Sequence, residues 1–382
     1  METIDNDDRG QVPLSEVGFA GQRSEENMQS NKASTDCMDI RLCPDVRNWS
    51  QEESREKLLK SLCEIKERDN GSKSFMICCS DFALNVTVRY NETVETENNI
   101  DNHSNIGLLP ENCGKQFDDR LNGGNFTGIY EFPWMALISH VEKDSNGIEK
   151  RRFNCGGTII SSRYILTAAH CVYEKKIAGV RVGEYNIHSL TDCQGEWPNY
   201  VCESHLQDLR VEKATIHEAY STSPRLINDI AILRVNKEID FSFKNVKPIC
   251  LPVWKEARNV SLSGKRATVA GWGVTETGKW SNILHKVIVP IKAETYCTEY
   301  LERYSDPQDH TFKVLCAGEV GKDSCKGDSG GPLMLFEDYK DDYRMIQYGI
   351  VSYGQEECGS ASPGVYTDIT KYMKWILDNI KE

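Results

Sequence analysis

Hydrophobic and polar residues are distributed unevenly along the chain, and the changes in pattern divide it into segments. Residues 1–35 are acidic and polar with few aromatic side chains, a composition that predicts disorder. From Leu121 onward, short apolar runs alternate with Gly, Pro and Asn. Several of these runs have the length and composition of β-strands, among them residues 136–138, 158–160 and 268–270. We therefore expect an all-β region with two barrels over residues 121–382.

At the C-terminus the period of the apolar residues changes. Trp375, Ile376 and Ile380 recur at helical spacing within residues 372–380. This pattern predicts a C-terminal helix, and we expect it to pack on the second barrel.

The composition limits the class of protein. The chain has 382 residues and is 39% hydrophobic, which is enough for two or three units with a real core. Its formal net charge of -13 argues against nucleic acid or an anionic membrane as the main partner. The sequence contains no run of about 18 apolar residues, so we expect no membrane-spanning segment.

Cysteine usage indicates an oxidising compartment. The 15 cysteines have patterned spacing, as in secreted proteins with disulfides. Asn-x-Ser/Thr sequons agree with secretion and occur at Asn48, Asn70, Asn85, Asn91, Asn102, Asn125 and Asn259. Residues 1–35 nevertheless show no apolar segment of a signal peptide. We therefore expect a secreted protein whose N-terminal sequence here is misassigned or comes from an alternative exon.

Three motifs supply the side chains that nucleophilic catalysis by serine requires. A serine hydroxyl is a weak nucleophile at neutral pH and needs an adjacent base, and the base needs a buried acid that fixes its tautomer. Ser329 lies in Gly-Asp-Ser-Gly-Gly-Pro, His170 in Leu-Thr-Ala-Ala-His-Cys, and Asp229 in Asn-Asp-Ile-Ala-Ile-Leu. This set predicts a serine endopeptidase with Ser329 as nucleophile, His170 as base and Asp229 as acid.

These motifs, in the order His, Asp, Ser, resemble the trypsin/chymotrypsin peptidase family from about Leu121 to the C-terminus. The resemblance implies two six-stranded antiparallel β-barrels with a C-terminal helix. It also implies that the backbone amides of Gly327 and Ser329 form the oxyanion hole, which stabilises the charge of the tetrahedral intermediate. We expect no organic cofactor and no catalytic metal.

Substrate specificity is expected to depend on Asp323, six residues before Ser329. An acid at the floor of the pocket pairs with a cationic side chain. Gly354 and Gly364 match the glycines of the pocket wall, and Ser352 begins the edge that pairs with the substrate backbone. The resemblance therefore implies cleavage of protein substrates after Arg, with Lys second.

The sequence Arg120-Leu121-Asn122-Gly123-Gly124 resembles the activation junction of the family, which usually reads Arg-Ile-Val-Gly-Gly. Cleavage after Arg120 would free the ammonium group of Leu121 to pair with the carboxylate of Asp328. The new ion pair would then order the pocket and the oxyanion loop. The arginine implies an activator that is itself trypsin-like.

The cysteines within residues 36–79 resemble a clip domain, the small disulfide-rich module that precedes arthropod serine proteases. The family has six cysteines in this module and the chain has five, lacking the first. The resemblance implies the pairs Cys37–Cys63 and Cys43–Cys79 and leaves Cys78 without a partner. A zinc site at these cysteines is the weaker alternative, because paired C-x2-C spacing is absent. Residues 80–120 follow as an exposed linker and activation segment.

For the peptidase domain, residues 121–382, the resemblance implies five further disulfides: Cys113–Cys250, Cys155–Cys171, Cys193–Cys202, Cys297–Cys316 and Cys325–Cys358. The loop at Glu184 can hold calcium in trypsin-like relatives through oxygen ligands. Here the Cys193–Cys202 insertion alters that loop, and Leu206 stands where a second acid is expected. An ordinary solvated loop is therefore favoured over a calcium site.

Taken together, these features resemble the clip-domain proteases of arthropod extracellular cascades, such as the easter, Spätzle-processing and prophenoloxidase-activating enzymes. We expect a zymogen in innate immunity, melanisation or development. Its expected partners are a downstream zymogen or pro-cytokine, an upstream trypsin-like activator and a serpin inhibitor. The alternatives are a non-catalytic clip homologue acting as a scaffold, which usually lacks the serine, and a digestive enzyme, which needs no docking domain.

Overall fold

The computed structural model describes residues 37–39, 62–67, 73–78, 100–116, 127–195, 200–223, 225–275, 278–302, 313–320, 326–340, 342–354 and 362–382. The chain forms two compact units, Met1–Tyr90 and Asn91–Glu382. In the first unit, β1 (Cys37–Asp39), β2 (Leu62–Glu67) and β3 (Lys73–Cys78) form an antiparallel sheet in the order β1-β3-β2. The Cα of Cys37 lies opposite that of Cys78. Residues 1–35, for which disorder is predicted, lie outside the described residues. The side chains of the predicted pairs Cys37–Cys63 and Cys43–Cys79 are likewise not described.

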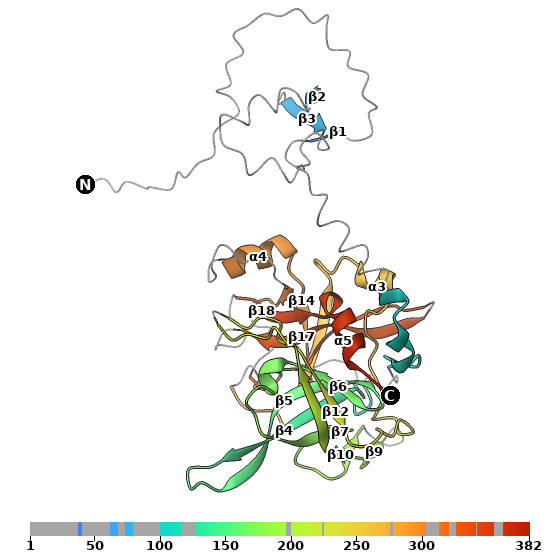
Figure 1. The fold of residues 1–382 in the computed structure, drawn as a ribbon, viewed down its shortest axis with the longest axis vertical. Coiled ribbons are helices and arrows are strands. Elements are labelled where there is room, and N and C mark those ends of the chain that lie inside the picture. Colours follow the sequence, from blue (N-terminus) through green and yellow to red (C-terminus); the bar gives the residue numbers. More distant parts are fainter. Residues whose placement is uncertain are drawn as a thin grey trace, which may run out of the picture. The chain divides into compact units, whose positions relative to one another are not determined.

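Seven strands form the first sheet of the larger unit (Figure 1), in the order β10-β7-β4-β5-β6-β12-β11. They are β4 (Met135–Lys143), β5 (Glu149–Ser161), β6 (Tyr164–Thr167), β7 (Ile177–Val182), β10 (Gln207–Leu209), β11 (Val211–Ile216) and β12 (Ala231–Val235). Only Arg210 separates β10 from β11, yet these two strands hold opposite edges of the sheet. One run of chain therefore supplies both edges, and the sheet curls round on itself.

The second sheet has the order β14-β13-β16-β17-β18-β15. Its strands are β13 (Arg266–Gly271), β14 (His285–Pro290), β15 (Val314–Ala317), β16 (Pro332–Asp338), β17 (Tyr343–Tyr353) and β18 (Gly364–Asp368). The edges β14 and β15 approach each other through a bridge between Ile291 and Ala317. The prediction of two antiparallel β-barrels is thus confirmed as two curled sheets, although the first sheet has seven strands where six were expected.

Fully buried β-branched and leucine side chains hold the first sheet together, including Ile138, Ile159, Ile165, Leu166, Ile232 and Leu233. Such residues pack well on a pleated surface that is covered by other elements. The segments that carry His170 and Asp229 adjoin this sheet directly, because β6 ends at Thr167 and β12 begins at Ala231.

Short elements complete the larger unit: β8 (Asp192–Gln194), β9 (Val201–Glu203), η6 (Ser104–Leu108), η7 (Ala169–Cys171), η8 (Ile369–Lys371), α3 (Lys255–Arg258), α4 (Glu294–Glu302) and α5 (Met373–Asn379). None of the helices within the described residues combines the length and the apolar character needed to cross a bilayer.

The C-terminal helix α5 was expected on the second barrel, and this expectation is wrong. Its polar anchors reach segments beside the first sheet instead: Trp375 Nε1 donates to Glu218 at 2.9 Å, and the Lys381 amide donates to Tyr164 Oη at 2.9 Å. The apolar face of α5 joins the large core, to which residues of both sheets contribute. The helical spacing revealed which face is buried but not which sheet covers it.

Residues 100–109 also differ from the expected exposed linker. Ile100 is buried, and Ile106, Leu108 and Leu109 pack against the large core. Asn105 Nδ2 donates to the backbone carbonyls of Leu377 at 2.9 Å and Ile380 at 3.1 Å, at the end of α5. These contacts satisfy carbonyls that a helix end leaves without partners. We call residues 100–109 the strap.

Candidate active site

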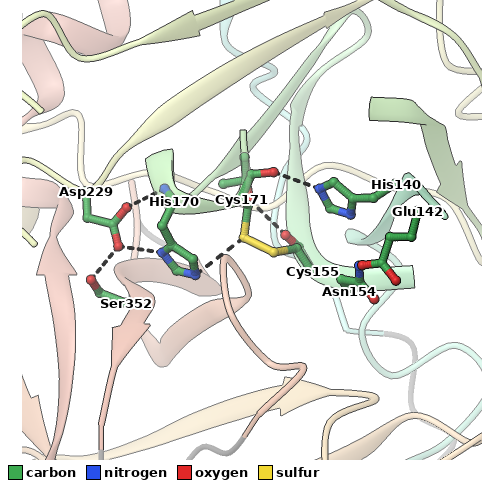
Figure 2. Close-up of a disulfide and its surroundings, with 10 residues drawn as sticks. His140, Glu142, Asn154, Cys155, His170, Cys171, Asp229 and Ser352 are labelled. Atoms are coloured by element: carbon green, nitrogen blue, oxygen red, sulfur yellow. Dashed lines mark hydrogen bonds and ion pairs between the residues drawn. A yellow bond between two sulfur atoms is a disulfide. The ribbon is translucent and has the colours of Figure 1, made fainter. Parts of the chain in front are cut away.

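His170 and Asp229 form a close pair at the ends of β6 and β12 (Figure 2). His170 Nδ1 lies 2.8 Å from Asp229 Oδ2, and the His170 backbone amide donates to Asp229 Oδ1 at 2.8 Å. Because the carboxylate accepts the proton on Nδ1, the other ring nitrogen, Nε2, is left as the acceptor. The pair therefore fixes the tautomer that a general base needs.

The carboxylate of Asp229 is almost completely buried, with its side chain 2% exposed. Burial raises its pKa, but hydrogen bonds from the His170 ring, the positive charge of His170, and bonds from Ser352 and the His170 amide outweigh this effect. The net pKa of Asp229 lies below its usual value. The acid therefore stays ionised beside the imidazole.

Two further hydroxyl groups hold Asp229 in place. Ser352 Oγ donates to Asp229 Oδ2 at 2.5 Å, and Thr367 Oγ1 donates to the Asp229 carbonyl at 2.8 Å. Ser352 was expected at the edge that binds the substrate backbone, and the structure shows that its side chain serves Asp229. Thr367 was missed, since nothing near it in the sequence marks it as a partner of a residue 138 positions away.

The turn that carries Ser329 packs against the segment that carries His170. The Gly156 amide donates to the Ser329 carbonyl at 2.8 Å. Gly330 has φ +79°, and a Cβ there would lie 2.2 Å from Thr167 Oγ1, so only glycine allows this approach. Among the described residues, no hydrogen bond joins Ser329 Oγ to His170 Nε2. In unliganded enzymes this bond is often long and tightens with substrate.

Gly327 and Ser329 carry the two amides expected to form the oxyanion hole. Gly327 has φ +97°, a left-handed conformation that side chains disfavour. Neither amide donates a hydrogen bond to another of the described residues, and in the expected oxyanion hole both would donate to the developing anion. In comparable enzymes, each preorganised donor of this kind stabilises the oxyanion by about 3 kcal/mol.

The disulfide Cys155–Cys171 borders the imidazole, with Cys171 Sγ 3.7 Å from His170 Nε2. On the far side of this disulfide, His140 Nε2 lies 2.7 Å from the Cys171 carbonyl (Figure 2). His140 is buried and ties β4 to η7, which carries His170. Sequence analysis missed this contact, because a lone histidine within an apolar strand carries no motif.

Asp328 precedes the nucleophile and points its carboxylate toward the end of β13. Its Oδ1 accepts a hydrogen bond from the Gly273 amide at 2.9 Å. The expected activation residues Arg120 and Leu121 lie outside the described residues, as do Asp323 and the pair Cys325–Cys358. Gly364 is buried at the start of β18, and Gly354 follows the end of β17.

Four of the expected disulfides are present in the larger unit: Cys113–Cys250, Cys155–Cys171, Cys193–Cys202 and Cys297–Cys316. Cys193–Cys202 joins β8 to β9, and Cys297–Cys316 joins α4 to β15. Cys113–Cys250 attaches the N-terminal chain to the peptidase body across 137 positions.

The donor set at Glu184 does not favour calcium. Glu184 accepts hydrogen bonds from Arg181 at 3.2 Å and from the Tyr185 amide at 3.0 Å. The second buried acid of the loop, Asp192, accepts from the Asn186 amide and from the Ser189 hydroxyl. Each carboxylate oxygen already has a donor in the protein, and a guanidinium group faces Glu184. Burial raises the pKa of Glu184, and the nearby charge of Asp192 acts in the same direction.

This arrangement suits acyl transfer through a covalent intermediate. His170 Nε2 can take the proton of Ser329 as its oxygen attacks a carbonyl carbon, and Asp229 then stabilises the imidazolium. The amides of Gly327 and Ser329 would bind the oxyanion. The protonated His170 can give its proton to the leaving amine, after which water repeats the cycle on the acyl group.

Comparison with known proteins places these residues in context. The trypsin family model matches residues 121–376. The chain is 40% identical to melanization protease 1 of Drosophila melanogaster over 290 residues, covering 73% of this chain and 70% of that protein. It is 33% identical to CLIP domain-containing serine protease B10 of Anopheles gambiae over 358 residues, covering 90% and 91%.

A solved structure is similar as well. The crystal structure of the Drosophila Grass clip serine protease of the Toll pathway superposes with a TM-score of 0.60 at 32% identity. The match covers 85% of this chain and 86% of that one. The likeness therefore extends over both sequence and fold.

Proposed function

Because this chain belongs to the trypsin family, among the clip-domain serine proteases of arthropods, we propose that it is a secreted zymogen that cleaves proteins after Arg in an extracellular cascade. Trypsin-like serine endopeptidase activity follows from the family. The His170–Asp229 pair, with Ser329 on the adjacent turn, is the observation that carries the activity. It also argues against a non-catalytic scaffold, which lacks the nucleophile.

The proposal of zymogen activation is supported by Asp328. Its carboxylate is hydrogen-bonded to the Gly273 amide on one oxygen, next to the turn that carries both oxyanion amides. A new ammonium group from Leu121 would be drawn to this carboxylate, because a partly buried charge gains from an ion pair with good geometry. Pairing at Asp328 would then hold the backbone amides of Gly327 and Ser329 in the orientation that binds the oxyanion.

The proposed Arg specificity rests on Asp323, with Lys as the second choice. The proposed activator is a trypsin-like protease, since the bond to be cut follows Arg120. A serpin is the proposed inhibitor, because its reactive loop would present the same kind of bond. The names of the relatives place them in melanization and in the Toll pathway, which makes a downstream zymogen or pro-cytokine the proposed substrate.

One experiment tests activation and specificity together. The secreted full-length chain is treated with a trypsin-like protease, the new N-terminus is sequenced, and hydrolysis of matched Arg and Phe peptides is measured. We expect Leu121 as the new N-terminus and activity only against the Arg peptide. An Arg120→Gln chain should remain uncleaved and inactive under the same treatment. Activity of the uncleaved chain, or a preference for Phe, would contradict the proposal.

A further inference from the structure

His217 lies beside the segment that carries the catalytic acid and is half-buried there. Its amide donates at 3.2 Å to the carbonyl of Ile230, the residue directly after Asp229. Its imidazole packs edge-on against the ring of Tyr372, with 5.5 Å between the ring centroids, and the ring of Trp375 lies 5.3 Å away. Histidine changes charge near neutral pH more readily than any other unperturbed side chain, so its contacts can depend on pH.

Three hydrogen bonds connect His217 and Tyr372 through the residue before Asp229. The Ala219 amide donates to His217 Nδ1 at 3.2 Å, and the Ala219 carbonyl accepts from Asn228 Nδ2 at 2.8 Å. Asn228 Oδ1 accepts from the Tyr372 hydroxyl at 2.8 Å. Because the ring of Tyr372 also packs on His217, the contacts close on themselves. We call His217, Ala219, Asn228 and Tyr372 the Asn228 support.

Asn228 adopts a conformation that needs such support. Its φ of 51° is left-handed, and a backbone of this kind persists only where surrounding contacts hold it. The Asn228 carbonyl accepts from the Ile230 amide at 2.8 Å, so the backbone turns tightly around Asp229. The direction in which the chain enters Asp229 is therefore set at Asn228, one residue from the carboxylate that lies 2.8 Å from the His170 ring.

The bond from Ala219 requires a neutral imidazole. Nδ1 of His217 can accept the amide proton only while it carries no proton of its own. Burial lowers the pKa of His217, Glu218 opposes this shift, and Lys313 adds to it. Burial raises the pKa of Tyr372, which keeps its hydroxyl as a donor. The Asn228 support is therefore complete near neutral pH and loses one bond as the pH falls through the folded pKa of His217.

We propose that His217 positions the catalytic acid: its Nδ1 holds Ala219 and Asn228, and protonation of Nδ1 loosens Asp229 beside His170. His217 is a positioning residue, because it acts through Ala219 and Asn228. This inference rests on the proposed function, since its main readout is peptide hydrolysis. It implies that a second protonation lowers the activity in acid, in addition to protonation of the general base.

Two substitutions separate the acceptor of His217 from its aromatic ring. His217→Asn keeps an oxygen near the place of Nδ1, because asparagine accepts from the amide two residues on in an Asx turn, and this side chain cannot be protonated. His217→Phe keeps a ring against Tyr372 and Trp375 but removes the acceptor. If His217 served packing alone, His217→Phe would be the milder change. If its acceptor positions Asp229, His217→Asn is the milder change.

The Arg120-cleaved full chain is assayed for kcat/KM with an Arg peptide from about pH 4 to about pH 8. Protonation of the general base alone gives the logarithm of kcat/KM a slope of about 1 in acid. Protonation of His217 should lower the parental kcat/KM about tenfold further, as loss of one hydrogen bond does. His217→Asn should keep the parental value near pH 8 without the further loss, and His217→Phe should be about tenfold slower throughout. His188→Asn, which removes an exposed histidine, should match the parent.

The outcomes distinguish the two proposals. The same further loss in His217→Asn as in the parent, or full activity in His217→Phe, would overturn the role of Nδ1 and leave the proposed function intact. Absence of turnover in the cleaved parent chain would contradict the proposed function instead.

A titration of His217 by NMR in the uncleaved chain decides its role without turnover. The signal is identified among the eight histidines by its loss in His217→Asn. Because coupling between two sites is reciprocal, weakening the Asn228 support elsewhere should make His217 easier to protonate. Tyr372→Phe should therefore raise the pKa of His217, whereas Tyr343→Phe, at an exposed tyrosine, should not. Equal pKa values of His217 in these two variants would overturn the proposal.

Discussion

Tyr372 Oη donates a hydrogen bond of 2.8 Å to Asn228 Oδ1, so the N-cap of helix α5 holds the residue directly before Asp229. Asn228 has φ 51°, a left-handed conformation that is uncommon outside glycine. Its Nδ2 donates in turn to the Ala219 carbonyl at 2.8 Å. The residue that precedes Asp229 is therefore held by the start of the C-terminal helix.

Tyr372→Phe removes this bond without changing the shape of the side chain. We expect a loss of about 1 kcal/mol in unfolding free energy, with the Asn228 oxygen left without its donor. For a domain of this size, that corresponds to a melting midpoint lower by about 2–4 °C. The melting midpoints of the Tyr372→Phe and Tyr343→Phe chains are compared by calorimetry. Tyr343→Phe is the control, because Tyr343 is exposed. Equal midpoints in the two variants would show that the bond does not hold Asn228.

Asp323→Ser should change specificity more than catalysis. The substitution removes the charge partner of a bound arginine but leaves His170, Asp229 and Ser329 in place. We expect kcat/KM for Arg peptides to fall by more than about 100-fold, because the proposed pocket loses the carboxylate that pairs with the charged side chain. Activity against matched Phe peptides should change little. An unaltered ratio of Arg to Phe hydrolysis would disprove the assignment of the pocket.

Acid should destabilise the native state through Asp229. Its pKa is below the usual value in the folded chain, so the unfolded state binds the proton more readily. The resulting stability is present above about pH 4, the unfolded pKa of aspartate, and is lost as the pH falls through the folded pKa. We expect Ser329→Ala protein to lose melting temperature below pH 4 more steeply than the Ser329→Ala, Asp229→Asn double variant. Parallel curves for the two proteins would contradict this linkage.

Residues 100–109 should stabilise the peptidase unit through α5. Asn105→Ala leaves the carbonyls of Leu377 and Ile380 without their side-chain donor, and we expect a cost of about 1–2 kcal/mol. Ser104→Ala is the matched control, because within the described part of the chain its exposed hydroxyl bonds to Asn105 and does not reach α5. Hydrogen exchange should show faster opening of residues 373–380 in Asn105→Ala. If both variants exchange at the parental rate, the strap does not hold the helix.

The loop at Glu184 should be insensitive to metal chelation. We propose that Arg181 supplies the positive charge in this loop, since it contacts Glu184 at 3.2 Å and Asp208 at 2.7 Å. Addition of EDTA or of calcium should leave the melting midpoint and the activity unchanged. Arg181→Gln strands the buried Glu184 carboxylate and should cost about 3 kcal/mol. A melting midpoint of the parent chain that rises on addition of calcium would support a calcium site at this loop.

The sequence was most informative where chemistry demands particular residues at particular places. The motifs around His170, Asp229 and Ser329 indicated the site, and the structure brings the first two to 2.8 Å. The cysteine pairs of the larger unit followed from the resemblance rather than from spacing, since spacing leaves many pairings open. Strand runs in the peptidase region predicted the two sheets.

Contacts between distant segments could not be read in this way. The strap has no period, because Ile100, Ile106, Leu108 and Leu109 fill separate gaps in a core built by other elements. Helix α5 showed which face is apolar but gave no sign of the surface it covers. The bond from Ser352 to Asp229 spans 123 positions, and no local pattern encodes it.

The bond after Arg120 lies between Cys113 and Cys250, inside a covalent loop closed by their disulfide. Cutting a bond in a closed loop opens it without parting its ends. If the chain is cut after Arg120, the N-terminal module and the peptidase would thus stay covalently joined, and the strap adds a second, noncovalent attachment. A surface that binds the N-terminal module would then tether the cleaved peptidase. Tethering would raise the effective concentration of the peptidase toward proteins on the same surface. Once the chain is cut after Arg120, reduction of Cys113–Cys250 would leave the strap contacts as the remaining attachment between the two parts.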